Sequence, residues 1–419
     1  MERRIYLDHA AGTPVDPRVE RAMRPYFLRS FGNPGSLHLF GQEAIAAVDA
    51  AREAIARLIG ADFREVVFTG SATEANNLAL RGAIRAWKDD PANKGRAPRV
   101  IVSAIEHESV LETARDLARE GAEVICAPVD GRGAVDPEWI IHAIHGNGND
   151  GRTAIVSVMY VNNEIGTVEP VAAIAEAVRT AREKSGAHRA ISKWPLFHTD
   201  AAQAFQYFDC DVKRLGIDMM TLSAHKICGP KGIGALFVRA GTPLAPVVTG
   251  GGQEFGLRSG TENVPLIVGF AKAAELAVAA RSGETKRVAS LRNHCIKGIK
   301  EISRDVEING NGGISFSPEV APHIVNVSFP GKAAEDIVMR LDLAGIAVSS
   351  GSACRARAIE PSYVVRALGA GSGDGSGHDA AAKIDADVLA RSSIRVSFGR
   401  TTGKADIDRL LAAITGIFR

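Results

Sequence analysis

Short apolar runs alternate with helix-like patterns along most of this 419-residue chain, and that alternation limits its possible folds more than any other feature. The runs are rich in Val, Ile and Leu, and they include residues 66–69, 100–103, 124–127, 154–159, 196–199 and 219–223. Strands of such uniform apolar content are typical of a parallel sheet covered by helices on both faces. With right-handed crossover connections, the sequence predicts an α/β fold with a large, doubly wound, mainly parallel sheet.

The pattern changes after Pro265. A long helical pattern runs from Leu266 to about Asp305, and the strand-like segments that follow, such as 324–329 and 393–398, are more widely spaced. We therefore expect a large domain over residues 16–264 and a smaller α+β domain formed by residues 1–15 and 265–419. Two Gly-rich segments, 145–152 and 369–378, are expected to be loops or insertions.

The composition excludes several classes of protein. Fifty basic and 48 acidic residues leave a net charge of +2, so no strong field attracts nucleic acid or an anionic membrane. No uncharged apolar run reaches the roughly 18 residues of a membrane span, and we expect no membrane segment. Five cysteines, an odd number without C-x-x-C spacing, indicate neither a disulfide framework nor a zinc site. We expect a reducing compartment, and therefore the cytoplasm.

The segment Ser71-Ala72-Thr73-Glu74 follows a predicted strand and opens a predicted helix. Ser71 and Glu74 have the spacing of a capping box, so a well-capped helix is one complete explanation. An anion site is the other, because small side chains let the N–H groups at a helix N-terminus approach a phosphate. The sequence leaves both explanations open.

Asp200 and Lys226 each stand at the end of a predicted strand. Open α/β sheets bind ligands at this position, although Asp200 alone would also suit a helix N-cap. Small and apolar neighbours of Lys226 indicate an enclosed amine, whose pKa desolvation lowers. An amine for a Schiff base, a carboxylate for a pyridinium nitrogen and a phosphate cradle are together what pyridoxal phosphate (PLP) requires.

Two further side chains suit the same cofactor. Gln203, three residues after Asp200, can donate to the phenolic oxygen of the PLP ring. His107 follows another predicted strand and can stack on the ring, whereas a hydrogen-bonded residue at a strand end is the alternative explanation for it.

Nine segments, in order along nearly the whole chain, resemble motifs of the NifS/IscS cysteine desulfurases, in the aminotransferase class V family of fold-type I PLP-dependent transferases. They are YLDHAAGTPVDP (6–17), FGNPGSLHLFG (31–41), FTGSATEANNLAL (68–80), VNNEIGTVEP (161–170), HTDAAQ (198–203), SAHKICGPKGIG (223–234), GGGQEFGLRSGTEN (250–263), SSGSAC (349–354) and SSIRVSFGR (392–400). No single segment is decisive, but their number and order make the resemblance specific.

The resemblance implies a role for each matching residue. Lys226, Cys354 and His107 are implied as catalytic. The implied cofactor contacts are Ala72, Thr73, His107, Asn163, Asp200, Gln203, Ser223, His225, Lys226 and Thr261. Of these, Thr261 is implied to reach the phosphate of the partner subunit in a homodimer. Asn163 and Arg395 are the implied substrate contacts, and neighbouring Asn162 is the alternative to Asn163.

Cys354 distinguishes a desulfurase from other members of the family. Small residues precede it, and Arg355 and Arg357 follow it. This setting favours an exposed thiolate over the burial that is usual for a free cysteine. We expect the other cysteines to pack in the interior: Cys126, Cys210, Cys228 and Cys295.

The resemblance implies a PLP-dependent cysteine desulfurase that turns L-cysteine into L-alanine and a persulfide on Cys354. In this cycle Lys226 removes the Cα proton, and His107 moves a proton to or from the substrate sulfur. The sulfur then passes to an acceptor protein, such as an iron–sulfur scaffold or a sulfur carrier, for iron–sulfur cluster assembly or tRNA thiolation. The sequence does not select the acceptor.

Other functions remain open. A selenocysteine lyase and a class V aminotransferase would use the same fold, and an aminotransferase would have no use for Cys354. A catalytically silent scaffold is opposed by the intact set of Lys226, Asp200, His107 and Cys354. A nucleotide-binding protein is weaker still, because the loop at 69–77 lacks P-loop spacing.

Overall fold

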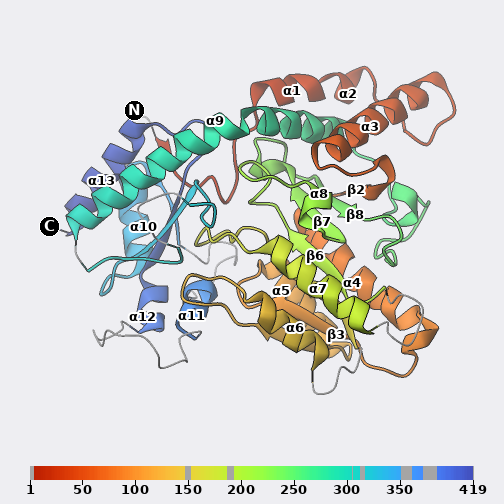
Figure 1. Ribbon diagram of the computed structural model, residues 1–419. Helices are drawn as coiled ribbons and strands as arrows, with labels where there is room; N and C mark the ends of the chain where they lie inside the picture. The colour runs from red at the N-terminus through yellow and green to blue at the C-terminus, as the bar shows by residue number, and fades with distance from the viewer. Residues whose placement is uncertain are drawn as a thin grey trace.

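The computed structural model describes residues 4–146, 152–185, 193–303, 305–311, 317–350, 361–370 and 385–418. The described strands form a seven-stranded sheet, a four-stranded sheet and a two-stranded pair, and helix α9 (Val264–Ile302) lies along the two larger sheets (Figure 1). The expected domain boundary between residues 264 and 265 falls at the start of this helix and stays a prediction.

The large sheet has seven strands, in the order β2-β8-β7-β6-β5-β3-β4. Their bounds are β2 (Val66–Thr69), β3 (Arg99–Ser103), β4 (Glu123–Ala127), β5 (Thr153–Ser157), β6 (Leu196–Asp200), β7 (Met219–Ser223) and β8 (Gly234–Val238). Only β8 runs against the others. The prediction of a mainly parallel sheet is confirmed, and all six strands expected from the apolar runs are present.

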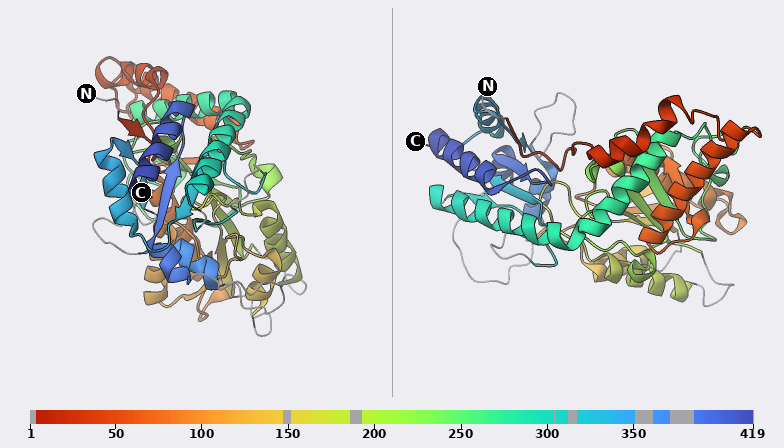
Figure 2. Two further views of the ribbon diagram at one scale, coloured as in Figure 1. Left: turned by 90° about the vertical axis from the view of Figure 1, so that its left-hand side faces the viewer. Right: turned by 90° about the horizontal axis from the view of Figure 1, so that it is seen from above.

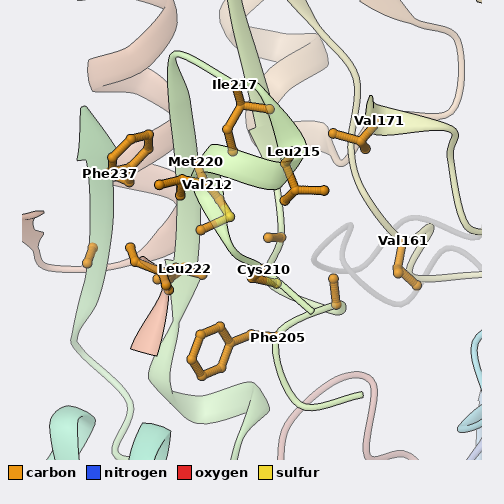
Figure 3. Close-up of a cluster of buried hydrophobic side chains, with 14 of the residues drawn as sticks. Val161, Val171, Phe205, Cys210, Val212, Leu215, Ile217, Met220, Leu222 and Phe237 are labelled. Carbon is orange, nitrogen blue, oxygen red and sulfur yellow. The ribbon is translucent and has the colours of Figure 1, made fainter. Parts of the chain in front are cut away.

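Alternating side chains give this sheet two apolar faces, because successive residues of a strand point to opposite sides. Phe68 faces a core shared with α3 (Leu39–Leu58), α6 (Pro137–His145), α7 (Val171–Ser185) and the first half of α9, whereas Val67 faces α4 (Ala72–Asp89) and α5 (Glu108–Arg119). Figure 3 shows part of the first core, which includes Met220 and Leu222 of β7, Phe237 of β8, and Phe205. Three shorter helices complete this part: α1 (Pro17–Met23), α2 (Pro25–Leu28) and α8 (Val212–Leu215).

The smaller sheet has four antiparallel strands, in the order β12-β13-β10-β9. Its strands are β9 (Glu307–Ile308), β10 (Ile324–Ser328), β12 (Ser349–Ser350) and β13 (Ser393–Ser397). Beside it, β1 (Ile5–Tyr6) pairs in parallel with β11 (Ile346–Ala347), so the start of the chain joins this part.

The second half of α9 covers the smaller sheet together with two other helices, α10 (Ala334–Leu343) and α13 (Lys404–Phe418). Figure 2 shows α9 passing from one part of the molecule to the other. Two further helices, α11 (Tyr363–Ala370) and α12 (Ala386–Arg391), pack against each other. Every helix in the described parts of the chain is too short or too polar to cross a bilayer.

A buried ion pair fixes the loop after β8 to the large sheet. The Arg52 guanidinium lies 2.6 and 2.8 Å from the two Glu254 carboxylate oxygens, and the side chains are 5% and 1% exposed. Glu254 also accepts the Phe68 N–H at 2.8 Å, and Arg52 donates to the Val66 carbonyl. The cost of burying these charges is therefore offset by further hydrogen bonds to strand β2.

We predict that Glu254→Gln lowers the free energy of unfolding by about 3 kcal/mol, because it leaves the Arg52 charge buried without its counter-ion. Arg179→Ala is the matched control, since Arg179 pairs with Glu176 and Glu183 on the surface, where solvent screening leaves an ion pair with little effect on stability. Denaturant unfolding measures both changes. Equal effects of the two substitutions would contradict the prediction.

Candidate active site

A cavity of about 250 Å³ lies at the carboxyl ends of the parallel strands. It is lined by Ala10, Ala11, Ser71, Ala72, Thr73, His107, Ser109, Met159, Val161, Asn163, Asp200, Ala202, Gln203, Ser223, His225, Lys226 and Arg395. Nine of the ten predicted cofactor contacts are in this set, together with the predicted substrate arginine. Another cavity, of about 350 Å³, lies between the start of α10 and the end of α12 and contains none of the predicted site residues.

The N-terminus of α4 opens into the site cavity. The Ser71 hydroxyl caps the helix by accepting the Glu74 N–H at 3.1 Å. The Glu74 carboxylate bonds to the N–H of Gly70 at 2.8 Å and to Arg258, so only half of the predicted capping box forms. The first backbone bond of the helix runs from the Ala75 N–H to the Ser71 carbonyl. The N–H groups of residues 72 and 73 therefore precede the helical ladder and are available to an anion.

Lys226 ends a short helical turn, Ala224–Lys226, that directly follows β7. Its Nζ atom donates to the carbonyls of Ala10 at 2.6 Å and Ala11 at 3.0 Å, so the N-terminal segment holds the amine in the cavity. Beside it, Ser223 Oγ lies 3.0 Å from His225 Nδ1. Burial, reinforced by Lys226, lowers the pKa of His225 to about 4, so this histidine is neutral near pH 7.

Asp200 ends β6, and its side chain is fixed from two directions. One carboxylate oxygen accepts from Asn76 Nδ2 at 2.8 Å and the other from the Ala202 N–H at 2.9 Å. Gln203 Nε2 donates to the Ala10 carbonyl at 2.9 Å, and its Oε1 lies 3.2 Å from His323 Nε2. These bonds place a carboxylate and an amide on the same wall of the cavity.

His107 is the N-cap of α5 and lies on the cavity wall. Its Nδ1 atom is 2.8 Å from Ser109 Oγ and accepts the Ser109 N–H at 3.1 Å. Burial is the main cause that lowers the pKa of His107, while the neighbouring Asp200 partly opposes the shift.

Arg395 joins the two parts of the molecule at the site. It lies on β13 and donates to the backbone carbonyl of Asn163 at 2.8 Å and to the Asp8 carboxylate at 2.9 Å. The Asn163 side chain lines the cavity and its Oδ1 is buried without a partner among the described residues. By contrast, the Asn162 side chain accepts the N–H groups of Glu164 and Ile165 in its own turn. The placement therefore favours Asn163 over Asn162 as the cavity residue.

Two predicted residues are not in the cavity. Thr261 is exposed and does not contribute to the lining. Cys354 lies outside the described residues, as do residues 371–378 of the Gly-rich segment.

The prediction for the other cysteines was wrong at one position. Cys126 is exposed because β4 is an edge strand, which lacks a neighbour on one side. Cys210, Cys228 and Cys295 are buried as expected. Cys210 lies among the apolar side chains of the large core in Figure 3.

Four contributors to the site were not predicted from the sequence. Ala10 and Ala11 act through backbone carbonyls, which no side-chain pattern reveals, and Asp8 acts by pairing with Arg395. Asn76 is fully buried on α4 and contacts Asp200. An amide on the apolar face of a helix, among Ala75, Leu78 and Ala79, was the available signal.

The cavity suits PLP in the chemistry of its donors. The N–H groups of residues 72 and 73 at the start of α4 have no partner among the described residues and, with the Ser223 hydroxyl nearby, fit a phosphate. Strand β8 packs so closely beneath this loop that a Cβ on Gly234 would lie 2.8 Å from the Ala72 nitrogen. Lys226 supplies an amine and Asp200 a carboxylate in the same space. Among the described residues, no group of three or more side chains suits a metal ion.

Comparisons with known proteins show the family of this chain. The aminotransferase class-V family model matches residues 5–410. The cysteine desulfurase IscS of Dictyoglomus turgidum is 38% identical over 417 residues, covering 100% of this chain and 95% of that protein. The cysteine desulfurase IscS 1 of Archaeoglobus fulgidus is 40% identical, covering 98% and 96%.

Two solved structures are similar over most of their length. A NifS-like protein has a TM-score of 0.83 and 32% identity, with 99% of each chain covered. SspA in complex with cysteine has a TM-score of 0.73 and 32% identity, with 94% of this chain and 98% of SspA covered. The fold and the cavity thus define a fold-type I enzyme of the NifS-like kind. The chain belongs to the aminotransferase class V family, and within it to the group of the IscS and NifS-like cysteine desulfurases.

A buried histidine behind the site makes stability depend on pH. His198 is fully buried between Ser157 and Thr221, and burial lowers its pKa from 6.5 to about 4. Between these values the unfolded chain binds a proton that the folded chain does not, so the free energy of unfolding falls as the pH decreases. One histidine contributes at most about 1.4 kcal/mol per pH unit.

We predict that His198→Gln, which retains polar atoms for both hydroxyls, makes the free energy of unfolding fall less steeply between pH 6.5 and 4. The change in slope should correspond to the uptake of about one proton fewer on unfolding. Urea unfolding at a series of pH values in that interval measures the slope. The prediction is wrong when wild type and variant show the same slope.

Proposed function

We propose that this chain is a PLP-dependent cysteine desulfurase, which converts L-cysteine into L-alanine and holds the removed sulfur as a persulfide on Cys354. The observation that carries the proposal is the gathering of Lys226, Asp200, His107 and Arg395 around one cavity. The cysteine desulfurases among its relatives support the choice of reaction.

PLP, held by the N–H groups of residues 72 and 73 with Ser223, His225 and Asp200, would supply a ring that accepts electrons from the substrate Cα. Lys226 takes the Cα proton on Nζ, which the carbonyls of Ala10 and Ala11 orient in the cavity. Asn76 and the Ala202 N–H keep the Asp200 carboxylate oriented.

Arg395 binds the substrate carboxylate, and the planar guanidinium suits a two-point contact that a lysine could not make. Its bonds to Asn163 and Asp8 fix its position before substrate arrives. The Cys354 thiolate then attacks the substrate sulfur. The new S–S bond forms as the C–S bond breaks, and the electron pair stays on the substrate carbon, which is protonated to give alanine.

We predict that the protein takes up sulfur from sulfur-35-labelled L-cysteine. We expect the wild-type protein to carry a label that a thiol reductant releases. We expect no label on Cys354→Ala or Lys226→Ala. Non-reducing electrophoresis and alanine analysis measure the two products. Alanine without protein-bound label would remove the role of Cys354. If neither product forms, the desulfurase is refuted. Turnover of selenocysteine would then identify a selenocysteine lyase, and turnover of an amino acceptor would identify an aminotransferase.

We also propose a homodimer. The exposed residues near the start of the chain include large apolar side chains, as a surface that binds a partner would: Phe27, Leu28, Phe31, Leu37, Leu39 and Phe40. Thr261 is exposed outside the cavity, a position suited to the phosphate site of a second subunit. The acceptors proposed are an iron–sulfur scaffold or a sulfur-carrier protein. We place the enzyme in the cytoplasm, where cysteine thiols stay reduced.

In such a dimer each site would combine Lys226 of one chain with Thr261 of the other. We predict that Thr261→Ala weakens PLP binding about tenfold, the effect of one lost hydrogen bond to a charged group. Mixed dimers of Thr261→Ala with Lys226→Ala chains then recover one complete site. At a PLP concentration well below the Kd of the Thr261→Ala protein, their bound PLP and desulfurase activity should exceed those of both parents. No gain after subunit exchange would contradict a shared site.

A further inference from the structure

A continuous chain of hydrogen bonds links the Asp200 carboxylate to the His107 ring. Asn76 Nδ2 lies 2.8 Å from Asp200 Oδ2 and 2.8 Å from Ser109 Oγ. Ser109 Oγ lies in turn 2.8 Å from His107 Nδ1. Asp200, Asn76 and Ser109 are all buried, and they come from β6, α4 and α5.

Asp200 sets the orientation of the Asn76 amide. A carboxylate only accepts hydrogen bonds, so the amide group that faces it must be the NH₂. The two N–H groups of Nδ2 then serve its two neighbours, one Asp200 and the other Ser109. This arrangement leaves Asn76 Oδ1 buried without a partner among the described residues. The two hydrogen bonds donated by Nδ2 thus form while the amide oxygen accepts none.

The direction of the remaining bonds follows. Ser109 Oγ accepts from Asn76, and its single hydrogen is free to point at His107 Nδ1. The Ser109 backbone N–H, which can only donate, also points at Nδ1 at 3.1 Å. Two donors on one ring nitrogen require that nitrogen to carry no proton. A neutral imidazole then has its hydrogen on Nε2.

We propose that Asn76 and Ser109 are positioning residues that hold His107 as the neutral tautomer protonated on Nε2, so that the ring presents an N–H donor to the cavity. Protonation of Nδ1 would break both accepted bonds, which agrees with the lowered pKa of His107. Nε2 makes no hydrogen bond within the described part of the chain, so its N–H is available to a ligand. The assignment of this donor to catalysis rests on the proposed function, whereas the tautomer does not.

The tautomer decides what His107 can do in the reaction. At Nε2 the neutral ring has no lone pair in its plane to take a proton, so it cannot act there as a base. It can donate a hydrogen bond to a sulfur or oxygen atom that gains negative charge, as neutral imidazoles do in other enzymes. Of the two directions of proton movement expected from the sequence, the structure therefore favours donation toward the substrate.

Nitrogen NMR of holoenzyme labelled with [¹⁵N]histidine tests the tautomer directly near neutral pH. We expect His107 Nδ1 to resonate in the range of an unprotonated ring nitrogen and Nε2 in that of a protonated one, with His107→Gln identifying the signals. Protonated Nδ1 beside unprotonated Nε2, or a doubly protonated ring, would overturn the proposal. The tautomer is read from the wild-type spectrum, and His107→Gln serves only to assign the two signals.

Asn76→Leu, which keeps the branched shape of the side chain without its polar atoms, tests the positioning. Without the amide, the Ser109 hydroxyl is free to accept from Nδ1, and we expect the Nδ1-protonated form to become detectable and kcat/KM for L-cysteine to fall about tenfold. Asn77→Ala, one residue away and bonded to Thr73 and Arg81, is the control and should change neither value. An unchanged tautomer in a folded Asn76→Leu protein would overturn the positioning role. Absence of desulfurase turnover in wild type would refute the proposed function and leave the NMR result valid.

Discussion

The site depends on one buried guanidinium. Arg395 stands on the small sheet, yet its donors reach the backbone of Asn163 in the large part and Asp8 near the start of the chain. At 2% exposure its charge needs these acceptors, because an unpaired buried cation is strongly unfavourable. The three segments that carry Arg395, Asn163 and Asp8 are therefore fixed relative to one another by the residue proposed to bind the substrate.

The rest of the cavity follows from the direction of the strands. In a parallel sheet the carboxyl ends share one edge, and residues 107, 163, 200 and 226 lie at or just after such ends. Their side chains need little further arrangement to meet. The exception is the N-terminal segment, whose Ala10 and Ala11 carbonyls hold Lys226 only because β1 joins the small part.

The local sequence pattern was sufficient to predict the six parallel strands and α9, because continuous apolar runs and a long helical period are strong signals. It could not give the antiparallel course of β8 or the two-residue strands of the small sheet, which depend on pairing with distant residues. In the site, residues at strand ends were found, and backbone acceptors such as Ala10 were not. Asn76 was missed because a lone amide on a helix has many structural explanations. Cys126 was misplaced because apolar content does not distinguish an edge strand from a central one.

The length of helix α9 limits where this chain can accept an inserted residue. It runs for 39 residues, about 58 Å at 1.5 Å per residue, with one half packed on α3 and the other on β10 and α13. Inserting one residue near its middle would turn the second half by about 100° relative to the first and move Arg395 away from Asn163. The spacing between the two larger sheets is therefore set by a fixed number of helical turns in α9, and we expect insertions to be tolerated in loops rather than in this helix.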